Sequence, residues 1–146
     1  MDINHGKYLG VDYGDARTGL AECDAYGMIA GRIGTIKEGG MRKTAIRVAK
    51  EAKARSCKKI IIGLPKNMDG SEGERAQVIR AFAELLTEYT DIPYDFCDER
   101  MSTMVAYRFL GATETYGKRR KESVDAVSAE VILQSYIDKE RNQKVN

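Results

Sequence analysis

Histidine and cysteine, the side chains of histidine-based catalysis and of most zinc sites, are scarce in this sequence. The only histidine, His5, lies in a polar N-terminal stretch ahead of the first predicted strand, where chains are commonly loose. The three cysteines, Cys23, Cys57 and Cys97, form no C-x-x-C pair. Their odd number and wide spacing argue against a disulfide framework or a zinc site. Any catalysis must therefore rest on carboxylates or a metal ion, and we expect the thiols to be small buried hydrophobic groups.

Long apolar runs and a strong net charge are also lacking. Acidic and basic residues interrupt the first thirty positions, which leaves no stretch suited to a signal peptide or a membrane span. We therefore expect a soluble cytoplasmic protein with no membrane partner. The 24 Lys and Arg residues against 22 Asp and Glu give a net charge of only +2. Any nucleic acid must accordingly be bound by local basic patches.

The length of 146 residues is typical of one domain that encloses its own core. The sequence contains no internal repeat that would indicate a repeat architecture. We predict a single domain over residues 1–146, in which residues 1–6 and 140–146 are loose tails.

The pattern of apolar residues predicts an α/β fold. Strands are expected at 7–13, 17–23 and 28–36 as an antiparallel meander, followed by an amphipathic helix at 41–55. The β-branched run 60–64 is typical of a strand buried on both faces of a parallel sheet. A capping box formed by Ser71 and Glu74 predicts that the next helix begins there. Residues 92–97 are expected to form the last strand.

The C-terminal third is predicted to contain two helices separated by a basic loop. Ser102 caps a short helix that ends at Gly111, and the loop covers 112–121. A final helix runs from about residue 122 to residue 139. The fold is thus an antiparallel three-strand meander joined to two parallel strands, with helices as the crossovers.

Acidic residues end two of the predicted strands and begin the last helix. Asp12 ends the first strand, Asp98 and Glu99 end the last one, and Asp125 lies near the start of the final helix. Functional groups in an open α/β sheet gather at the carboxyl ends of its strands. We therefore expect these acids to converge at one edge of the sheet.

Asp125 gives an independent indication of a metal site. At helical spacing it shares a face with Ala129 and Ile132, and an inward carboxylate is costly unless a partner such as a cation is present. Oxygen ligands of this kind suit Mg²⁺ or Mn²⁺, and two such ions can support phosphodiester hydrolysis without histidine. Each acid also has an ordinary explanation: Asp12 as a turn residue, Glu99 as an ion-pair partner of Arg100, and Asp125 as a first-turn helix acid.

Four motifs, in their order and spacing, make the sequence resemble a known family. They are VDYGDARTG at 11–19, IGLPKNMDGSE at 62–72, DERMST at 98–103 and KESVDA at 121–126. From about residue 7 to residue 136 the chain resembles the YqgF family, described as Holliday junction resolvases and as nucleases that trim precursor small-subunit ribosomal RNA. The resemblance implies a ribonuclease H-like fold, with a mixed five-stranded sheet flanked by helices and an acidic metal site.

The resemblance also implies a set of site residues. Asp12, Glu99 and Asp125 match the catalytic positions, where they would hold one or two Mg²⁺ or Mn²⁺ ions. Asp98 is adjacent to Glu99, and strand alternation points the two side chains in opposite directions, so we assign Glu99 as the ligand and Asp98 as a supporting acid. The residues whose types suit phosphate and sugar contacts are Arg17, Asn67, Arg100, Ser102, Thr103, Lys118, Arg119 and Arg120.

Part of that contact set has a second explanation that the sequence leaves open. Turn and helix-cap roles account equally well for Asn67, Ser102 and Thr103. The basic run 118–121 is explained equally well as a solvated loop.

The implied function is that of a metal-dependent phosphodiester hydrolase that processes the 5′ end of precursor small-subunit ribosomal RNA as a monomer or weak homodimer. One alternative is a resolvase that acts as a dimer on four-way DNA. Another is a non-catalytic factor that binds nucleic acid or the ribosome. Nucleotide hydrolysis ranks last: the hairpin at 12–19 resembles that of actin-like ATPases, which need a second domain, and residues 63–73 lack the ending of a Walker loop.

Overall fold

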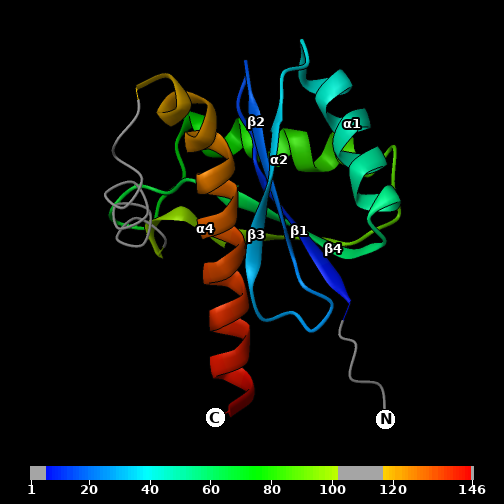
Figure 1. Ribbon diagram of the computed structural model, residues 1–146. Coiled ribbons are helices and arrows are strands. Elements are labelled where there is room, and N and C mark those ends of the chain that lie inside the picture. Colours follow the sequence, from blue (N-terminus) through cyan, green and yellow to red (C-terminus); the bar gives the residue numbers. More distant parts are fainter. Residues whose placement is uncertain (1–5, 102–116, 146) are drawn as a thin grey trace.

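The computed structural model describes residues 6–101 and 117–145. The three N-terminal strands are β1 (Lys7–Asp12), β2 (Thr18–Cys23) and β3 (Ala30–Ile36). Helix α1 (Met41–Ala54) leads to β4 (Cys57–Leu64), and α2 (Glu74–Leu86) leads to β5 (Tyr94–Asp98). A short 3-10 turn, η1 (Glu99–Met101), follows β5, and the long helix α4 (Gly117–Val145) comes last, as Figure 1 shows.

The five strands form one mixed sheet in the order β3-β2-β1-β4-β5. β1 and β3 pair antiparallel with β2, whereas β4 pairs parallel with β1 and with β5. This is the predicted meander joined to two parallel strands. Because β1, β4 and β5 run in the same direction, their carboxyl ends lie at one edge of the sheet, next to one another.

Helices cover both faces of this sheet (Figure 1). Helices α1 and α2 pack on one face, in a core cluster that includes Ile60, Ile62 and Phe82. Helix α4 crosses the other face, where Leu133 belongs to a second cluster with Ile61. The side chains of β4 therefore alternate between the two cores. The apolar run 60–64 is confirmed as a strand buried on both faces.

Gly10 allows α4 to lie directly against β1. A Cβ atom at this position would come 2.8 Å from Cβ of Leu133 and 2.9 Å from the carbonyl oxygen of Ala129. Alternate residues of a strand share a face. Asp12 therefore lies on the same face of β1 as Gly10, which is the face that α4 covers.

Helix α4 is longer than predicted and continues through residues 140–145, so the expected loose tail is wrong for these residues. The hydroxyl of Tyr8 donates to the carboxylate of Glu140 at 2.8 Å, which ties the start of β1 to the last turns of the helix. Since Gly10 contacts earlier turns, α4 runs antiparallel to β1, and its last turns lie toward the same end of the molecule as the start of β1 in Figure 1. None of the described helices is long and apolar enough to cross a membrane.

The predicted capping box at the start of α2 is wrong. The helix begins at Glu74, with Gly73 as N-cap and no side-chain cap. Ser71 instead donates its hydroxyl to Asp69 at 2.6 Å and accepts a hydrogen bond from Asn67 at 2.9 Å. Local hydrogen bonds of this kind compete with helix capping, and here they hold a turn that precedes the helix.

The predicted basic loop is also wrong where the structure describes it. Residues 117–121 form the first turns of α4, in keeping with the high helix propensity of Lys and Arg. The remainder of that loop, 112–116, lies outside the described residues. So does the short helix predicted from Ser102 to Gly111.

All three cysteines are buried and free, as expected from their scarcity and spacing. Burial raises the pKa of Cys57 and of Cys97 to about 11, and it also raises the pKa of Cys23. At pH 8 only about one in a thousand of the first two thiols would be in the reactive thiolate form. We expect iodoacetamide to alkylate the folded protein far more slowly than the urea-unfolded chain, as measured by mass spectrometry. Equally fast alkylation of both states would contradict this burial.

Candidate active site

Two of the predicted acids meet at the carboxyl edge formed by β1, β4 and β5. The parallel register pairs Val11 with Ile62, and its continuation sets Asp12 beside Gly63. A Cβ atom on Gly63 would come 2.8 Å from Oε1 of Glu99, so the Glu99 carboxylate lies over this glycine. Asp12 therefore lies next to the residue that Glu99 covers, and the fold brings these two acids together from distant parts of the chain.

Gly63 is the point where β4, α4 and Glu99 come into contact. The same Cβ atom would also come 2.5 Å from Cδ1 of Ile132 in α4. A side chain on Gly63 would displace the ends of the Ile132 and Glu99 side chains from these positions. This close approach gives a steric reason for the glycine in the second motif.

Partial burial distinguishes Glu99 from an ordinary surface glutamate. Desolvation raises the pKa of Glu99, the positive charge of Arg75 opposes that rise, and the negative charge of Asp98 adds to it. A carboxylate whose ionised form is poorly solvated is stabilised by a nearby cation. Perturbed acids of this kind are enriched at functional sites.

Asp98 has a different environment from its neighbour. Its two carboxylate oxygens accept hydrogen bonds from the guanidinium of Arg100, of which the shortest is 2.6 Å. The backbone N–H of Arg100 donates to it as well, at 3.0 Å. These hydrogen bonds hold the pKa of Asp98 below its usual value. The pairing supports the assignment of Asp98 as a structural acid and of Glu99 as the candidate ligand.

The third predicted acid, Asp125, lies in α4, and its side chain is outside the described part of the structure. Ala129 lies over Gly10, and Asp125 precedes Ala129 by about one helical turn. Because α4 is antiparallel to β1, this turn lies toward the end of β1 that carries Asp12. Among the described side chains, no three Asp, Glu, His or Cys residues form a metal-binding group. The set of three ligands therefore stays a prediction.

The turn after Asp12 is closed by its own hydrogen bonds. The N–H of Gly14 donates to the Thr18 hydroxyl at 3.3 Å, and that hydroxyl is 3.4 Å from the carbonyl oxygen of Gly14. A side chain on Gly14 would overlap the carbonyl oxygen of Arg17, so a glycine is required. Arg17 is exposed on this turn, where a phosphate could reach it.

Arg75, in the first turn of α2, is a candidate that sequence reasoning missed. Its guanidinium donates to the carbonyl oxygen of Tyr13 at 2.7 Å and to Asp15 at 3.3 Å. It also lies over the Tyr13 ring, which stacks on Phe82. Since its charge lowers the pKa of Glu99, Arg75 brings a positive charge to the acidic edge. Nothing in the local sequence marks it, because only the packing of α2 against the end of β1 brings it there.

Other predicted phosphate contacts are either used internally or not described. Asn67 bonds to Ser71 through its side chain at 2.9 Å, and Arg100 bonds to Asp98 and to the carbonyl oxygen of Met68. For both residues this favours a turn-stabilising role. Ser102 and Thr103 lie outside the described residues, as do the side chains of Lys118, Arg119 and Arg120.

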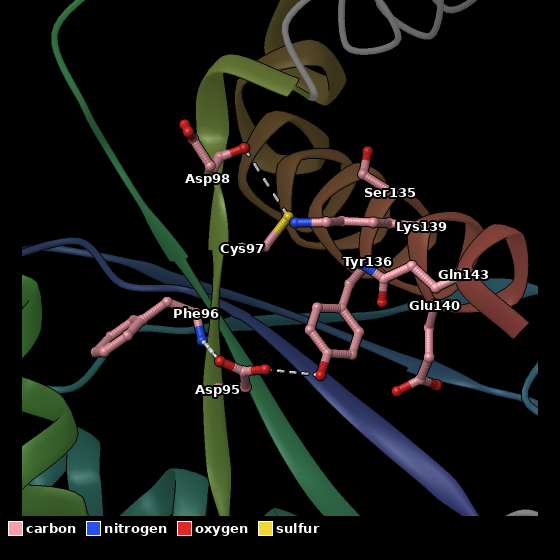
Figure 2. A pocket seen from close by; sticks show the side chains of 9 residues that line it. All are labelled: Asp95, Phe96, Cys97, Asp98, Ser135, Tyr136, Lys139, Glu140 and Gln143. Atoms are coloured by element: carbon pink, nitrogen blue, oxygen red, sulfur yellow. Dashed lines mark hydrogen bonds between the residues drawn. The ribbon is translucent and has the colours of Figure 1, made fainter. Parts of the chain in front are cut away.

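A cleft of about 300 Å³ lies between β5 and α4 (Figure 2). The residues that line it include Asp98 and Lys139. Figure 2 shows the Lys139 side chain beside the sulfur of Cys97. Tyr136 donates to Asp95 at 2.8 Å and accepts from Lys59 at 2.6 Å. These polar groups are bonded to one another, which is typical of a structural network, and we assign the cleft no catalytic role.

Comparisons with known proteins agree over almost the whole chain. Residues 6–139 match a family described as "RuvX: Holliday junction resolvase". A "Putative pre-16S rRNA nuclease" from Ruegeria sp. (strain TM1040) is 41% identical over 134 residues, which are 92% of this chain and 85% of that protein. A relative of the same name from Caldanaerobacter subterraneus is 39% identical over 138 residues, covering 93% and 99%.

Solved structures with low sequence identity share the fold. The T. thermophilus RuvC chain in complex with a Holliday junction substrate has a TM-score of 0.62 at 13% identity, covering 93% of this chain and 97% of that one. The fowlpox virus resolvase in complex with Holliday junction DNA has a TM-score of 0.54 at 13% identity, covering 91% and 97%. These similarities concern the fold alone, and they confirm the expected ribonuclease H-like architecture.

Proposed function

The chain belongs to the RuvX family, also called YqgF, and on this premise we propose that it is a metal-dependent nuclease that processes the 5′ end of precursor small-subunit ribosomal RNA. The observation that carries the proposal is the convergence of Asp12 with the half-buried carboxylate of Glu99 beside Gly63. The names of relatives at about 40% identity support the substrate. We further propose a cytoplasmic location and a monomeric or weakly dimeric state.

The residues at the acidic edge suit a hard divalent cation. Burial raises the pKa of Glu99, and a cation relieves the cost of a buried negative charge. Asp12, Glu99 and Asp125 supply only oxygen atoms, the ligands that Mg²⁺ and Mn²⁺ prefer, and would hold one or two such ions. Bound there, these ions would activate a water molecule and stabilise the leaving oxygen of a phosphodiester.

The basic residues of the chain would position the substrate around this edge. Arg75 is held by Tyr13 and Asp15 and would orient a phosphate near Glu99. Lys118, Arg119 and Arg120 begin the helix that carries Asp125, where they would bind the nucleic-acid backbone. Such contacts fix the register of the backbone without reading its sequence. Binding should therefore weaken as the salt concentration rises.

Resolution of four-way DNA is the second candidate function. The family description names this activity, and the structure of T. thermophilus RuvC with a junction substrate supports it through the fold. A resolvase has to act as a dimer on a two-fold symmetric junction, whereas trimming an RNA end requires one active site. Sedimentation of the protein with and without a junction would measure this difference.

Cleavage assays with both substrates test the proposal. We expect cleavage of a precursor ribosomal RNA end in Mg²⁺ or Mn²⁺, none in chelator, and none by Asp12→Asn, which loses one negative charge at the edge. Asp91→Asn changes an exposed acid that follows α2 and is a matched control that should cleave normally. Junction cleavage alone would support the second candidate.

The opposite outcome is equally well defined. If neither substrate is cut, or if Asp12→Asn cuts as well as the natural protein, the catalytic assignment is wrong. Binding that survives chelation without any cleavage would then identify a non-catalytic nucleic-acid-binding factor.

A further inference from the structure

The loop between β4 and α2 carries an unusually exposed apolar side chain. Met68 is 95% exposed, more than any other large hydrophobic residue that the structure describes. Single exposed apolar residues are common on protein surfaces. This one differs in two respects: the backbone around it is held by several hydrogen bonds, and it lies beside the acidic edge.

The segment 66–71, called the Met68 loop below, is fixed by its own hydrogen bonds. The N–H of Asn67 donates to the carbonyl oxygen of Ser71, and the N–H of Gly70 donates to that of Asn67, both at 2.9 Å. Asp69 accepts from the N–H and the hydroxyl of Ser71, at 2.9 and 2.6 Å. Gly70 has a φ of 89°, a conformation that favours glycine. Met68 therefore extends from an ordered turn, which lowers the entropy that a contact through this side chain would cost.

Arg100 connects the Met68 loop to the candidate active site. One nitrogen of its guanidinium donates to the carbonyl oxygen of Met68 at 3.2 Å, and the others bind Asp98. Asp98 is followed directly by Glu99. The backbone of the loop is thus one arginine side chain away from Asp98 at the end of β5, directly before the half-buried Glu99. These hydrogen bonds place the Met68 loop beside the carboxyl end of β5.

We propose that Met68 packs against the face of a nucleobase next to the cleaved phosphodiester, at an unpaired base or at the end of a helix. The proposal rests on the nuclease function proposed above and adds the structural class of nucleic acid that the site takes. Apolar side chains inserted at base steps unstack them. Methionine is flexible and polarisable, and every base has a face to contact, so the contact requires no particular sequence.

Oxidation footprinting of the natural protein tests this contact directly. Exposed methionine is converted to the sulfoxide by peroxide, and trypsin releases Met68 in the peptide 67–75. Met28, which is 43% exposed on the β2–β3 turn, is an internal control in the peptide 18–32. With chelator present to prevent cleavage, saturating structured RNA should slow oxidation of Met68 about fivefold or more and leave Met28 unchanged. Equal rates at Met68 with and without bound RNA would overturn the proposal.

Variants give a second measurement. Met68→Ala should raise the Kd for structured RNA about tenfold, whereas Met68→Leu, which keeps the apolar volume, should stay within about twofold. Ile29→Ala removes another exposed apolar side chain, on the β2–β3 turn, and should have no effect. A 2-aminopurine placed beside the cleavage site should brighten when the natural protein or the leucine variant binds, but not with Met68→Ala.

The outcomes separate this proposal from the function on which it rests. If Met68→Ala binds and brightens the probe like the natural protein while Asp12→Asn loses cleavage, the nuclease assignment stands and the role of Met68 is wrong. If the natural protein binds neither RNA nor a DNA junction, both proposals fail together.

Discussion

Glu99→Gln is expected to lower kcat/KM for RNA cleavage about a thousandfold or more, while Asp98→Asn lowers it about tenfold. The first substitution removes the charge of a carboxylate that lies over Gly63 beside Asp12. The second weakens the hydrogen bonds that hold Arg100, and through Arg100 the Met68 loop, but it keeps the charge of Glu99. Steady-state kinetics in saturating Mg²⁺ measure both variants. The reverse order of effects would show that Asp98 is the ligand.

Stability of the metal-free protein gives an independent readout for the same pair. Burial raises the pKa of Glu99, so the folded protein binds this proton more tightly than the unfolded chain, and stability falls as the pH rises through the folded-state pKa. Because glutamine stays neutral, Glu99→Gln should raise the melting temperature at pH 7 and change it little at pH 4.

The sign is opposite for Asp98. Arg100 lowers its pKa, so its stabilisation is present above the unfolded-state pKa and is lost as the pH falls through the folded-state pKa. Asp98→Asn should therefore lower the melting temperature at pH 7 more than in strong acid. Thermal unfolding in chelator at several pH values measures both variants, and the same direction of change for both would contradict the different environments of these two acids.

Gly10→Ala is expected to destabilise the protein by about 2–3 kcal/mol, in the range of an overpacked core. The new methyl group would come 2.8 Å from Cβ of Leu133 and 2.9 Å from the carbonyl oxygen of Ala129. Neither atom is the far end of a flexible side chain, so α4 has to move away from β1. For a domain of this length the melting temperature should fall by about 6–12 °C. Because α4 also carries Asp125, cleavage should decrease as well.

Gly39→Ala is the matched control for this substitution. A Cβ atom on Gly39 has nothing within 4 Å, so the melting temperature should stay within about 2 °C of the natural protein. Differential scanning calorimetry of the two alanine variants measures the contrast. Equal melting temperatures for the two variants would show that α4 does not lie on β1 at Gly10.

The sequence predicted secondary structure well where a segment shows one clear apolar pattern. The apolar run 60–64 lies within β4, and the amphipathic pattern at 41–55 matches α1 within one residue. Errors arose where local signals competed. The Ser71 side chain could cap a helix or close a turn. In the folded loop it forms hydrogen bonds with Asn67 and Asp69, which stabilise the turn. Residues 140–145 were predicted to be a tail because they are mostly polar. The sequence does not indicate that Glu140 accepts a hydrogen bond from Tyr8.

The candidate site was predictable only in part. Asp12 and Glu99 were identified from motifs and from strand ends, and the structure brings them together at one edge. Arg75 was missed because no sequence motif contains it, and only the packing of α2 against the end of β1 brings it to this edge. The side chain of Asp125 lies outside the described residues, so its role stays a prediction.

By itself, the sequence determined the order of strands and helices, the burial of β4 on both faces and the glycine turn after Asp12, because these follow from neighbouring residues and their periodicity. The sequence assigned different roles to the adjacent acids Asp98 and Glu99, but only the tertiary structure showed that their pKa values shift in opposite directions. Their ordinary pKa values are similar, so the difference comes from their surroundings. Glu99 is desolvated over Gly63, in a strand more than thirty residues away in the sequence. Asp98 instead accepts hydrogen bonds from Arg100, which lower its pKa.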